Sequence, residues 1–327
     1  MSEAQPMDIP AGAALPMEKV TIGTRSSKLA LWQADYVAER LRQQYPGLVV
    51  EERLMTTKGD KILDAPLAKI GGKGLFTKEL EQAMLAGEID IAVHSLKDMP
   101  TEVPDGLVIT AITERYDPGD AFVSNTYASL DDLPQGAVVG TSSLRRKAQL
   151  LHARPDLVIK DLRGNVNTRL SKLDAGEYDA AVLAVAGLKR LGFGGRITEV
   201  LPKSMILPAV GQGALAIESR ADDTTVRGLV AFLNDAPTVA CARAERAFLA
   251  RVEGGCQVPV GVYATPDGES LNVEAVIASL DGKRLYRDHV TGAKADAETL
   301  GTRLADRLLD AGGIEIMHEI GLLLDRK

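Results

Sequence analysis

Two cysteines occur in the 327 residues of the chain, and one of them lies in a setting suited to covalent chemistry. Cys256 follows Gly254 and Gly255 in RVEGGCQVPVG, and paired glycines allow positive φ and close approach by another molecule. Its thiol is either a nucleophile or attachment point, or an ordinary turn residue. Because it follows an expected helix C-terminus, nearby cations would have to stabilise its thiolate. Cys241 lies within an apolar periodic pattern, so we assign it to packing.

A carboxylate occurs where acid–base chemistry is plausible. Lys97 and Asp98 lie in HSLKDMPTEVP, at the expected end of a strand and before a proline-bounded loop. Adjacent residues in extended backbone point in opposite directions, so one can face a cleft without neutralising the other. Asp98 could then act as a general acid or base, or stabilise a developing cation. A surface Lys–Asp pair in a turn is the alternative.

Arginine is concentrated in the middle of an acidic chain. The net charge of −7 disfavours nucleic-acid binding, yet SLRRK, DLRGNVNTR and GLKR follow one another closely. Such a concentration indicates a small anionic ligand in a cleft, with solvated helix faces as the alternative. The four histidines and two cysteines show no metal-ligand spacing, so we expect no metal site.

Two stretches of the chain follow one pattern, which predicts the elements that position these residues. VTIGTRSSKLALWQADYVAERL begins at Val20, and AVVGTSSLRRKAQLLHARP begins at Ala137. Each predicts a strand, a Gly-Thr-Ser junction and a helix whose first N–H groups can bind an anion. GEIDIAVHSLKD and GEYDAAVLAVAGLKR form a second matching pair. We therefore predict two α/β lobes, roughly 19–113 and 119–207, with chance similarity of two βα units as the alternative.

The last part of the chain predicts a small α+β domain. APTVACARAERAFLARVEGG indicates a helix that is ended by glycines. VPVGVYAT, LNVEAVIASL and KRLYRDHVTG indicate strands, and the Asp281-Gly282 pair predicts a hairpin between the last two. AETLGTRLADRLLDAGG indicates a final helix. Cys256 is expected between the first helix and the first strand of this domain.

Eight motifs together resemble those of the hydroxymethylbilane synthase family, also called porphobilinogen deaminase. In chain order they are TRSSKLALWQA, IGGKGLFTKELE, DIAVHSLKDMP, VGTSSLRRKAQL, LRGNVNTRLSKL, LAVAGLKRLG, PAVGQGALAIE and EGGCQVPVG. The resemblance runs from about residue 19 to near the C-terminus. It leaves out residues 1–18, to which we carry nothing over.

The resemblance implies a transferase of porphyrin and haem biosynthesis. Such an enzyme joins four porphobilinogen molecules head to tail with loss of ammonia, then releases the linear tetrapyrrole hydroxymethylbilane by hydrolysis. The resemblance also implies a dipyrromethane cofactor, held through a thioether at Cys256, and Asp98 as the catalytic acid and base. The other implied residues have cationic or hydroxyl side chains that suit carboxylates. They are Lys97, Ser143, Arg145, Arg146 and Arg163 for the cofactor, and Arg25, Ser27, Arg169 and Arg190 for the substrate.

The resemblance implies three domains, of which the first two resemble type II periplasmic binding proteins with a cleft between them. We expect a disordered tail at 1–18, domain 1 at 19–113 and 208–231, domain 2 at 114–207, and a C-terminal α+β domain at 232–327. The last of these carries the cofactor cysteine. The family also implies a monomer. The absence of a long apolar run and of a secretory signal predicts a cytoplasmic protein with no membrane partner.

Two other functions fit parts of the sequence. A two-lobed anion-binding protein without catalysis would need no Cys256 and would be expected to carry an export signal. A cysteine hydrolase would need a histidine base, and the four histidines show no such signature. Because one carboxylate must serve every addition to a growing chain, we also hypothesise movement of the loop around Cys256 and of the glycine-rich segment 70–76.

Overall fold

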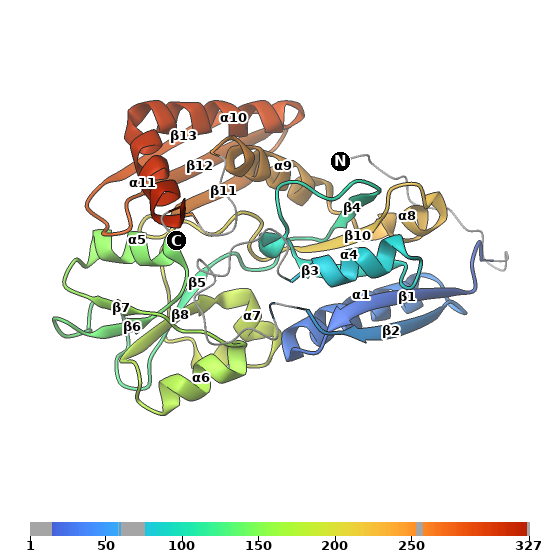
Figure 1. Cartoon of the computed structure of the whole chain (residues 1–327), viewed down its shortest axis with the longest axis horizontal. Helices are drawn as coiled ribbons and strands as arrows, with labels where there is room; N and C mark the ends of the chain where they lie inside the picture. Colours follow the sequence, from blue (N-terminus) through green and yellow to red (C-terminus); the bar gives the residue numbers. More distant parts are fainter. Residues whose placement is uncertain (1–14, 58, 60–75, 253–257, 326–327) are drawn as a thin grey trace. The chain divides into compact units, whose positions relative to one another are not determined.

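The computed structural model describes residues 15–57, 59, 76–252 and 258–325, which belong to two compact units (Figure 1). The first unit holds the described residues before Tyr116 together with Ala214–Val239. The second holds Tyr116–Gly213 and the described residues from Ala240 onward. Each unit is therefore built from segments that are separate in the sequence. Within the described part of the chain, no helix is long and apolar enough to cross a membrane.

A five-stranded sheet, in the order β2–β1–β3–β10–β4, forms the centre of the first unit. Its strands are β1 (Lys19–Arg25), β2 (Val49–Met55), β3 (Ile91–Ser95), β4 (Leu107–Ile112) and β10 (Leu215–Arg220). β1 pairs in parallel with β2 and β3, whereas β10 runs antiparallel between β3 and β4. The helical elements of this unit are α1 (Lys28–Gln44), α4 (Lys78–Leu85), α8 (Thr224–Val230) and the 3₁₀ turns η1 (Leu96–Asp98) and η3 (Ala231–Leu233).

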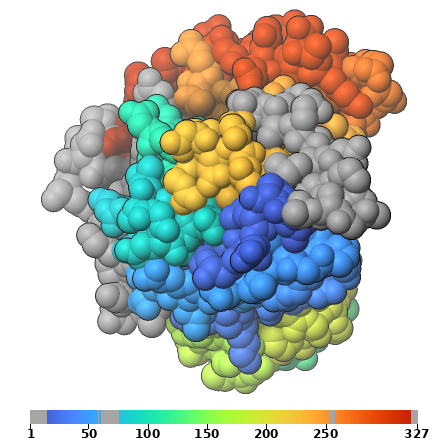
Figure 2. All heavy atoms as spheres, turned by 90° about the vertical axis from the view of Figure 1, so that its right-hand side faces the viewer, coloured from blue at the N-terminus to red at the C-terminus, as the bar shows by residue number. Residues whose placement is uncertain are grey.

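Different helices cover the two faces of this sheet. Successive side chains of a strand point to opposite faces, so Ile91 and Val93 of β3 pack in one core with residues of α1 and α8. Ala92 packs on the other face with residues of α4. Figure 2 shows α8, in yellow, at the surface beside the N-terminal segment in blue. Two segments far apart in the sequence thus share one hydrophobic core.

The second unit contains a sheet of the same size, in the order β7–β6–β8–β5–β9. Its strands are β5 (Asp120–Val123), β6 (Val138–Gly140), β7 (Val158–Lys160), β8 (Ala180–Ala184) and β9 (Glu199–Val200). The helical elements around it are α5 (Leu144–Ala153), α6 (Val166–Asp174), α7 (Val185–Arg190) and the 3₁₀ turn η2 (Gly194–Arg196). β6 pairs in parallel with β7 and β8, and β5 runs antiparallel between β8 and β9.

The two sheets share one plan, which confirms the repeat predicted from the sequence. The strand order matches position by position, with β1, β2 and β3 corresponding to β6, β7 and β8. In each sheet the fourth position holds an antiparallel strand, β10 in one and β5 in the other. These two strands occupy the same place in their sheets although they differ in sequence position. β10 comes after the other strands of its sheet, and β5 comes before the other strands of its sheet.

The second pair of matching motifs has the same structure in both units. Gly87 and Gly176 follow α4 and α6 with φ of 72° and 77°, a conformation that glycine adopts without a steric penalty. An aspartate three residues later closes each turn onto the first strand. The Asp90 carboxylate accepts a hydrogen bond from the backbone N–H of residue 21 at 2.8 Å. The Asp179 carboxylate accepts the equivalent bond from residue 138 at 2.7 Å.

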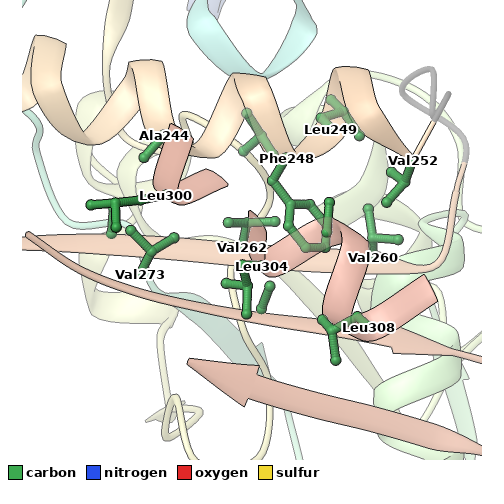
Figure 3. Packing of buried hydrophobic residues seen from close by; sticks show 14 of the residues in the cluster. Ala244, Phe248, Leu249, Val252, Val260, Val262, Val273, Leu300, Leu304 and Leu308 are labelled. Atoms are coloured by element: carbon green, nitrogen blue, oxygen red, sulfur yellow. The ribbon is translucent and has the colours of Figure 1, made fainter. Parts of the chain in front are cut away.

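The C-terminal part of the second unit is an antiparallel three-stranded sheet with helices. Its strands, in the order β11–β12–β13, are β11 (Val260–Asp267), β12 (Ser270–Ala278) and β13 (Leu285–Ala293). The helical elements are α9 (Ala236–Arg251), α10 (Ala297–Leu308), α11 (Ile314–Asp325), the 3₁₀ turn η4 (Lys294–Asp296) and the π-helical turn η5 (Leu309–Gly313). Figure 3 shows Phe248 of α9 and Leu304 of α10 packed over Val262 of β11. The predicted hairpin at Asp281-Gly282 is confirmed, whereas α11 was not predicted.

The predicted fold class is confirmed: two five-stranded α/β sheets and a small C-terminal domain with a three-stranded sheet and helices. The predicted domain ranges stay predictions. Most of the expected tail and residues 70–75 of the glycine-rich segment lie outside the described residues.

Candidate active site

A pocket in the first unit lies where β1 and β3 end and α1 and η1 begin. Figure 1 shows the ribbons of β1, β3 and α1. Its lining combines charged, polar and apolar side chains from these elements and from the start of α4. The lining residues are Arg25, Ala30, Gln33, Phe76, Thr77, Leu80, Val93, His94, Ser95 and Asp98. Two residues that the resemblance implies for the site, Arg25 and Asp98, therefore share one pocket.

Asp98 is exposed, but the turn that carries it is firmly anchored. The flanking Leu96 and Met99 are 1% and 2% exposed. The Leu96 N–H donates to the carbonyl of Ala214 at 3.0 Å, and the Met99 N–H donates to the carbonyl of Leu96 at 3.1 Å. Burial of Leu96 and Met99 fixes the backbone of the turn, so Asp98 is held beside the pocket.

One local prediction about this segment was wrong. Lys97 and Asp98 were expected at the end of an extended strand, with opposite side-chain directions following from strand geometry. The strand ends at Ser95, and Leu96–Asp98 form the 3₁₀ turn η1. Burial of Leu96 and Met99 favours a tight turn at this point over continued pairing, so strand alternation does not set the direction of either side chain.

Arg25 and Ser27 lie at the junction of β1 and α1. The Arg25 guanidinium carbon lies 4.8 Å from the centre of the Phe76 ring, a cation–π arrangement that holds the charge at the pocket. Ser27 is the N-cap of α1, and its Oγ accepts a hydrogen bond from the Ala30 N–H at 3.3 Å. Its hydroxyl proton can still be donated to a ligand.

Two further polar residues line the pocket that were not predicted as site residues. Gln33 is buried in α1, and its Nε2 donates to Ser95 Oγ at 2.7 Å. His94 is buried on β3, and its Nε2 lies 3.0 Å from Glu218 Oε2 of β10. From the sequence, His94 could be a packed, hydrogen-bonded residue at a strand end, and the structure confirms both its burial and its hydrogen bond. Gln33 was not singled out, and a polar residue on the apolar face of a helix was the available signal.

In the second unit, Arg145 and Arg146 form a buried ion-pair cluster with Asp120, the first residue of β5. Arg145 Nη1 lies 2.6 Å from Asp120 Oδ2, and Arg146 Nη2 lies 2.7 Å from Asp120 Oδ1. Further donors are used on backbone carbonyls: Arg145 Nη1 to residue 207 at 2.7 Å, and Arg146 Nη1 to residue 182 at 3.2 Å. Both arginines were predicted to be site residues, whereas their carboxylate partner Asp120 was not predicted.

The electrostatics of this cluster leave an excess of positive charge. Burial alone would raise the pKa of Asp120, but the charges and hydrogen bonds of Arg145 and Arg146 outweigh it and lower the pKa well below the usual range. Asp120 is therefore ionised at neutral pH. Two guanidinium groups against one carboxylate leave one positive charge, which favours an anion nearby.

The remaining predicted residues of this unit lie on three separate helices or at their starts. Ser143 is the N-cap of α5 and accepts a hydrogen bond from the Arg146 N–H at 3.3 Å. Arg169 of α6 donates from Nε to the carbonyl of Gly164 at 2.8 Å, and Arg190 of α7 donates to the carbonyl of Gly213 at 2.9 Å. Arg163 precedes α6 by three residues.

Family models match the two parts of the chain. A model described as "Porphobilinogen deaminase, dipyromethane cofactor binding domain" matches residues 20–228, and one described as "Porphobilinogen deaminase, C-terminal domain" matches residues 239–310. The chain belongs to the porphobilinogen deaminase family. It is thus a member of an enzyme family of tetrapyrrole biosynthesis whose cofactor is dipyrromethane, as the sequence motifs predicted.

Several solved structures of binding proteins are similar to this porphobilinogen deaminase family member. The methionine-binding protein MetQ is 17% identical, with 66% of this chain and 89% of that chain covered and a TM-score of 0.43. A nutrient binding protein from Burkholderia cenocepacia bound to methionine is 18% identical, with 68% of this chain and 93% of that chain covered and a TM-score of 0.42. The periplasmic VFT2 domain of BvgS from Bordetella pertussis is 16% identical, with 65% of this chain and 86% of that chain covered and a TM-score of 0.39.

The donor set of the second unit fits a dipyrromethane cofactor. Dipyrromethane made from porphobilinogen carries an acetate and a propionate on each ring, so it is strongly anionic. The arginine cluster has one positive charge in excess, and Ser143 places a hydroxyl at the N-terminus of α5, where backbone dipoles favour anions. The described residues are thus chemically suited to the group.

The two cysteines have different positions in the family member. Cys241 is buried in the core of the C-terminal domain, which confirms its assignment to packing. Cys256, between α9 and β11 in the chain, lies outside the described residues, so its role stays a prediction.

Proposed function

We propose that this porphobilinogen deaminase family member is a transferase that condenses four porphobilinogen molecules head to tail on a covalent dipyrromethane primer. Each condensation releases ammonia, and hydrolysis then frees the linear tetrapyrrole hydroxymethylbilane. The observation that supports this most directly is the pocket that Asp98 and Arg25 share at the ends of β1 and β3, within the matched cofactor-binding domain.

Asp98 is the proposed catalytic acid and base. Ammonia leaves porphobilinogen only if the amine is protonated, and its departure leaves a positively charged methylene-pyrrole. A carboxyl can donate the proton and, once ionised, stabilise the developing cation. Asp98 suits both roles because it is exposed at the pocket on an anchored turn.

Permanent cations are proposed to hold the carboxylates of substrate and cofactor. Arginine forks bind carboxylates through two parallel hydrogen bonds and stay charged at any physiological pH. The proposed substrate residues are Arg25, Ser27, Arg169 and Arg190, and the proposed cofactor residues are Lys97, Ser143, Arg145, Arg146 and Arg163. The net positive charge of the Asp120 cluster supports this assignment for Arg145 and Arg146.

Cys256 is the proposed attachment point of the cofactor through a thioether. When bound, dipyrromethane supplies the pyrrole carbon to which the first substrate is joined. The chain's own part is to provide a thiolate on a glycine-rich segment that a large pyrrole can approach. A cytoplasmic monomer and movement of the segments around Cys256 and 70–76 also remain proposals.

The experiment that tests the function compares Asp98→Asn with Asp105→Asn in porphobilinogen consumption. Asp105 is an exposed carboxylate of the same unit, outside the pocket, and serves as the matched control. We expect Asp98→Asn to lose about 10²–10⁴-fold in turnover, the usual contribution of a general acid, with an unchanged unfolding midpoint. We expect Asp105→Asn to behave as wild type. Normal turnover by Asp98→Asn would remove Asp98 from its role.

A further inference from the structure

The face of the first sheet that lies under α4 carries a buried ionisable cluster. His94 of β3 and Glu218 of β10 lie on the same face, because His94 is paired with Ala216, two residues before Glu218. The His94 Nε2 to Glu218 Oε2 distance is 3.0 Å, and the two side chains are 6% and 0% exposed. The pair is thus almost completely removed from water.

A third member of the cluster comes from α4, which covers this face. Glu81 is 6% exposed. Its Oε1 and the Oε1 of Glu218 are buried, and neither has a hydrogen-bond partner among the described residues. An ionised carboxylate oxygen without a donor is costly in an apolar surrounding, so burial of the Glu81 carboxyl favours its protonated form.

The surroundings of Glu81 raise its pKa overall. Burial raises the pKa of Glu81, and the negative charge of Glu218 adds to the increase. Thr77, His94 and Lys78 act in the opposite direction but do not cancel the effect. The net effect is that Glu81 keeps its proton to a higher pH than an ordinary glutamate does.

His94 connects this cluster to the pocket. His94 lines the pocket that Asp98 and Arg25 also line, whereas Glu81 and Glu218 are not among its lining residues. The other charged side chain on the same turn as Asp98 is Lys97. The imidazole is therefore the one member of the cluster that lines the pocket of the proposed acid.

We propose that Glu81, Glu218 and His94 form a proton-holding cluster that keeps Asp98 supplied with the proton it donates. Glu81 and Glu218 act through His94 and are positioning residues rather than catalytic ones. The inference rests on the proposed function, because only a reaction that protonates a leaving amine needs such a supply.

The proton count closes over each cycle. Asp98 transfers one proton to the amine, which leaves as ammonia, and the cluster returns one proton to Asp98 by way of His94. Formation of the new carbon–carbon bond releases one proton from the pyrrole ring carbon, and the cluster takes up that proton. No proton is gained or lost in the sum, so the cluster ends in its starting state.

The test combines infrared spectroscopy with kinetics on the cofactor-loaded enzyme. We expect a carbonyl band from a protonated, buried carboxyl in wild type at pH 7 that is absent in Glu81→Gln. We expect Glu81→Gln to lower kcat several-fold with unchanged KM, because Glu81 does not line the pocket. The difference in kcat between wild type and Glu81→Gln should be largest at low pH. It should disappear as the pH rises through the raised pKa of Glu81, because wild type also loses this proton there.

Controls separate this role from a purely structural one. Glu88→Gln removes an exposed carboxylate just beyond α4 and should leave the band and the pH profile unchanged. Glu81→Asp, which can still titrate, should restore part of the pH dependence, whereas a deficit equal at every pH would overturn the proposal. Absence of any protonated-carboxyl band in wild type at pH 7 would overturn it without a variant. Wild type that does not consume porphobilinogen would instead refute the proposed function.

Discussion

At the scale of single residues, the second unit owes its arginine cluster to one aspartate. Asp120 accepts hydrogen bonds from Arg145, from Arg146 and from Gln212 Nε2, the last at 3.1 Å. All four side chains are buried. Without Asp120, two guanidinium groups would remain uncompensated in a place that water does not reach, which is strongly unfavourable.

We therefore expect Asp120→Asn to destabilise the protein although it conserves the shape of the side chain. Removing one partner of a buried ion pair costs about 3–5 kcal/mol of unfolding free energy, which chemical denaturation can measure. Exposed Asp132→Asn is the matched control and should change the unfolding free energy little.

The pH dependence of that difference has a definite sign. The pKa of Asp120 is lowered in the folded state, so its contribution is present above the ordinary carboxyl value of 3.8 and is lost as the pH falls below it. The gap in unfolding free energy between wild type and Asp120→Asn should shrink below about pH 4. A gap that is constant with pH would contradict an origin in the ionised carboxylate of Asp120.

At the scale of elements, the repeated βα unit explains why the same residue types recur in both lobes. A Cβ at Gly23 would clash with Cδ1 of Ile89, and one at Gly140 would lie 2.8 Å from Cδ1 of Tyr178. Each glycine thus makes room for the residue that precedes the closing aspartate. The glycine, the N-cap serine and the aspartate together position the end of the first strand, where the proposed site residues lie.

Asp179→Ala should weaken the second lobe because it removes the acceptor for the N–H of residue 138. The loss of one charge-assisted hydrogen bond should lower the unfolding free energy by about 1–3 kcal/mol. Asp179→Asn keeps an acceptor oxygen and should lower it less. Exposed Asp161→Ala is the matched control, measured in the same denaturation series. Equal stability of Asp179→Ala and wild type would show that this bond is not needed.

At the scale of the whole molecule, the chain leaves the first unit after residue 115 and returns to it at Ala214. β5 follows the point where the chain leaves the first unit, and β10 follows the point where it returns. Each is the antiparallel fourth strand of its sheet, β10 in the first unit and β5 in the second. The candidate residues are likewise divided, with Arg25, Ser27, Lys97 and Asp98 in the first unit and the other described ones in the second. Because the proposed cofactor is covalent, it should be detectable on the intact molecule.

Native mass spectrometry of the purified protein should therefore show a monomer that carries the mass of two linked pyrroles. Cys256→Ser should lose this addition, because a hydroxyl is a far weaker nucleophile than a thiolate. Cys241→Ala, at the buried cysteine, should retain it and serves as the matched control. A wild-type mass without the addition in fully active protein would refute attachment at Cys256.

The sequence by itself determined the repeated α/β plan, the C-terminal hairpin and the family, because these depend on local patterns of apolar residues, glycines and capping serines. It also identified Asp98 and Arg25, which the structure brings into one pocket. Only the tertiary structure decided that Asp120 pairs with Arg145 and Arg146, that Leu96–Asp98 form a turn, and that Glu81 and Glu218 lie around His94. These contacts join residues 13 to 124 positions apart or depend on burial of neighbouring side chains. Local propensity carries no information about such partners, which are chosen by the packing of whole elements.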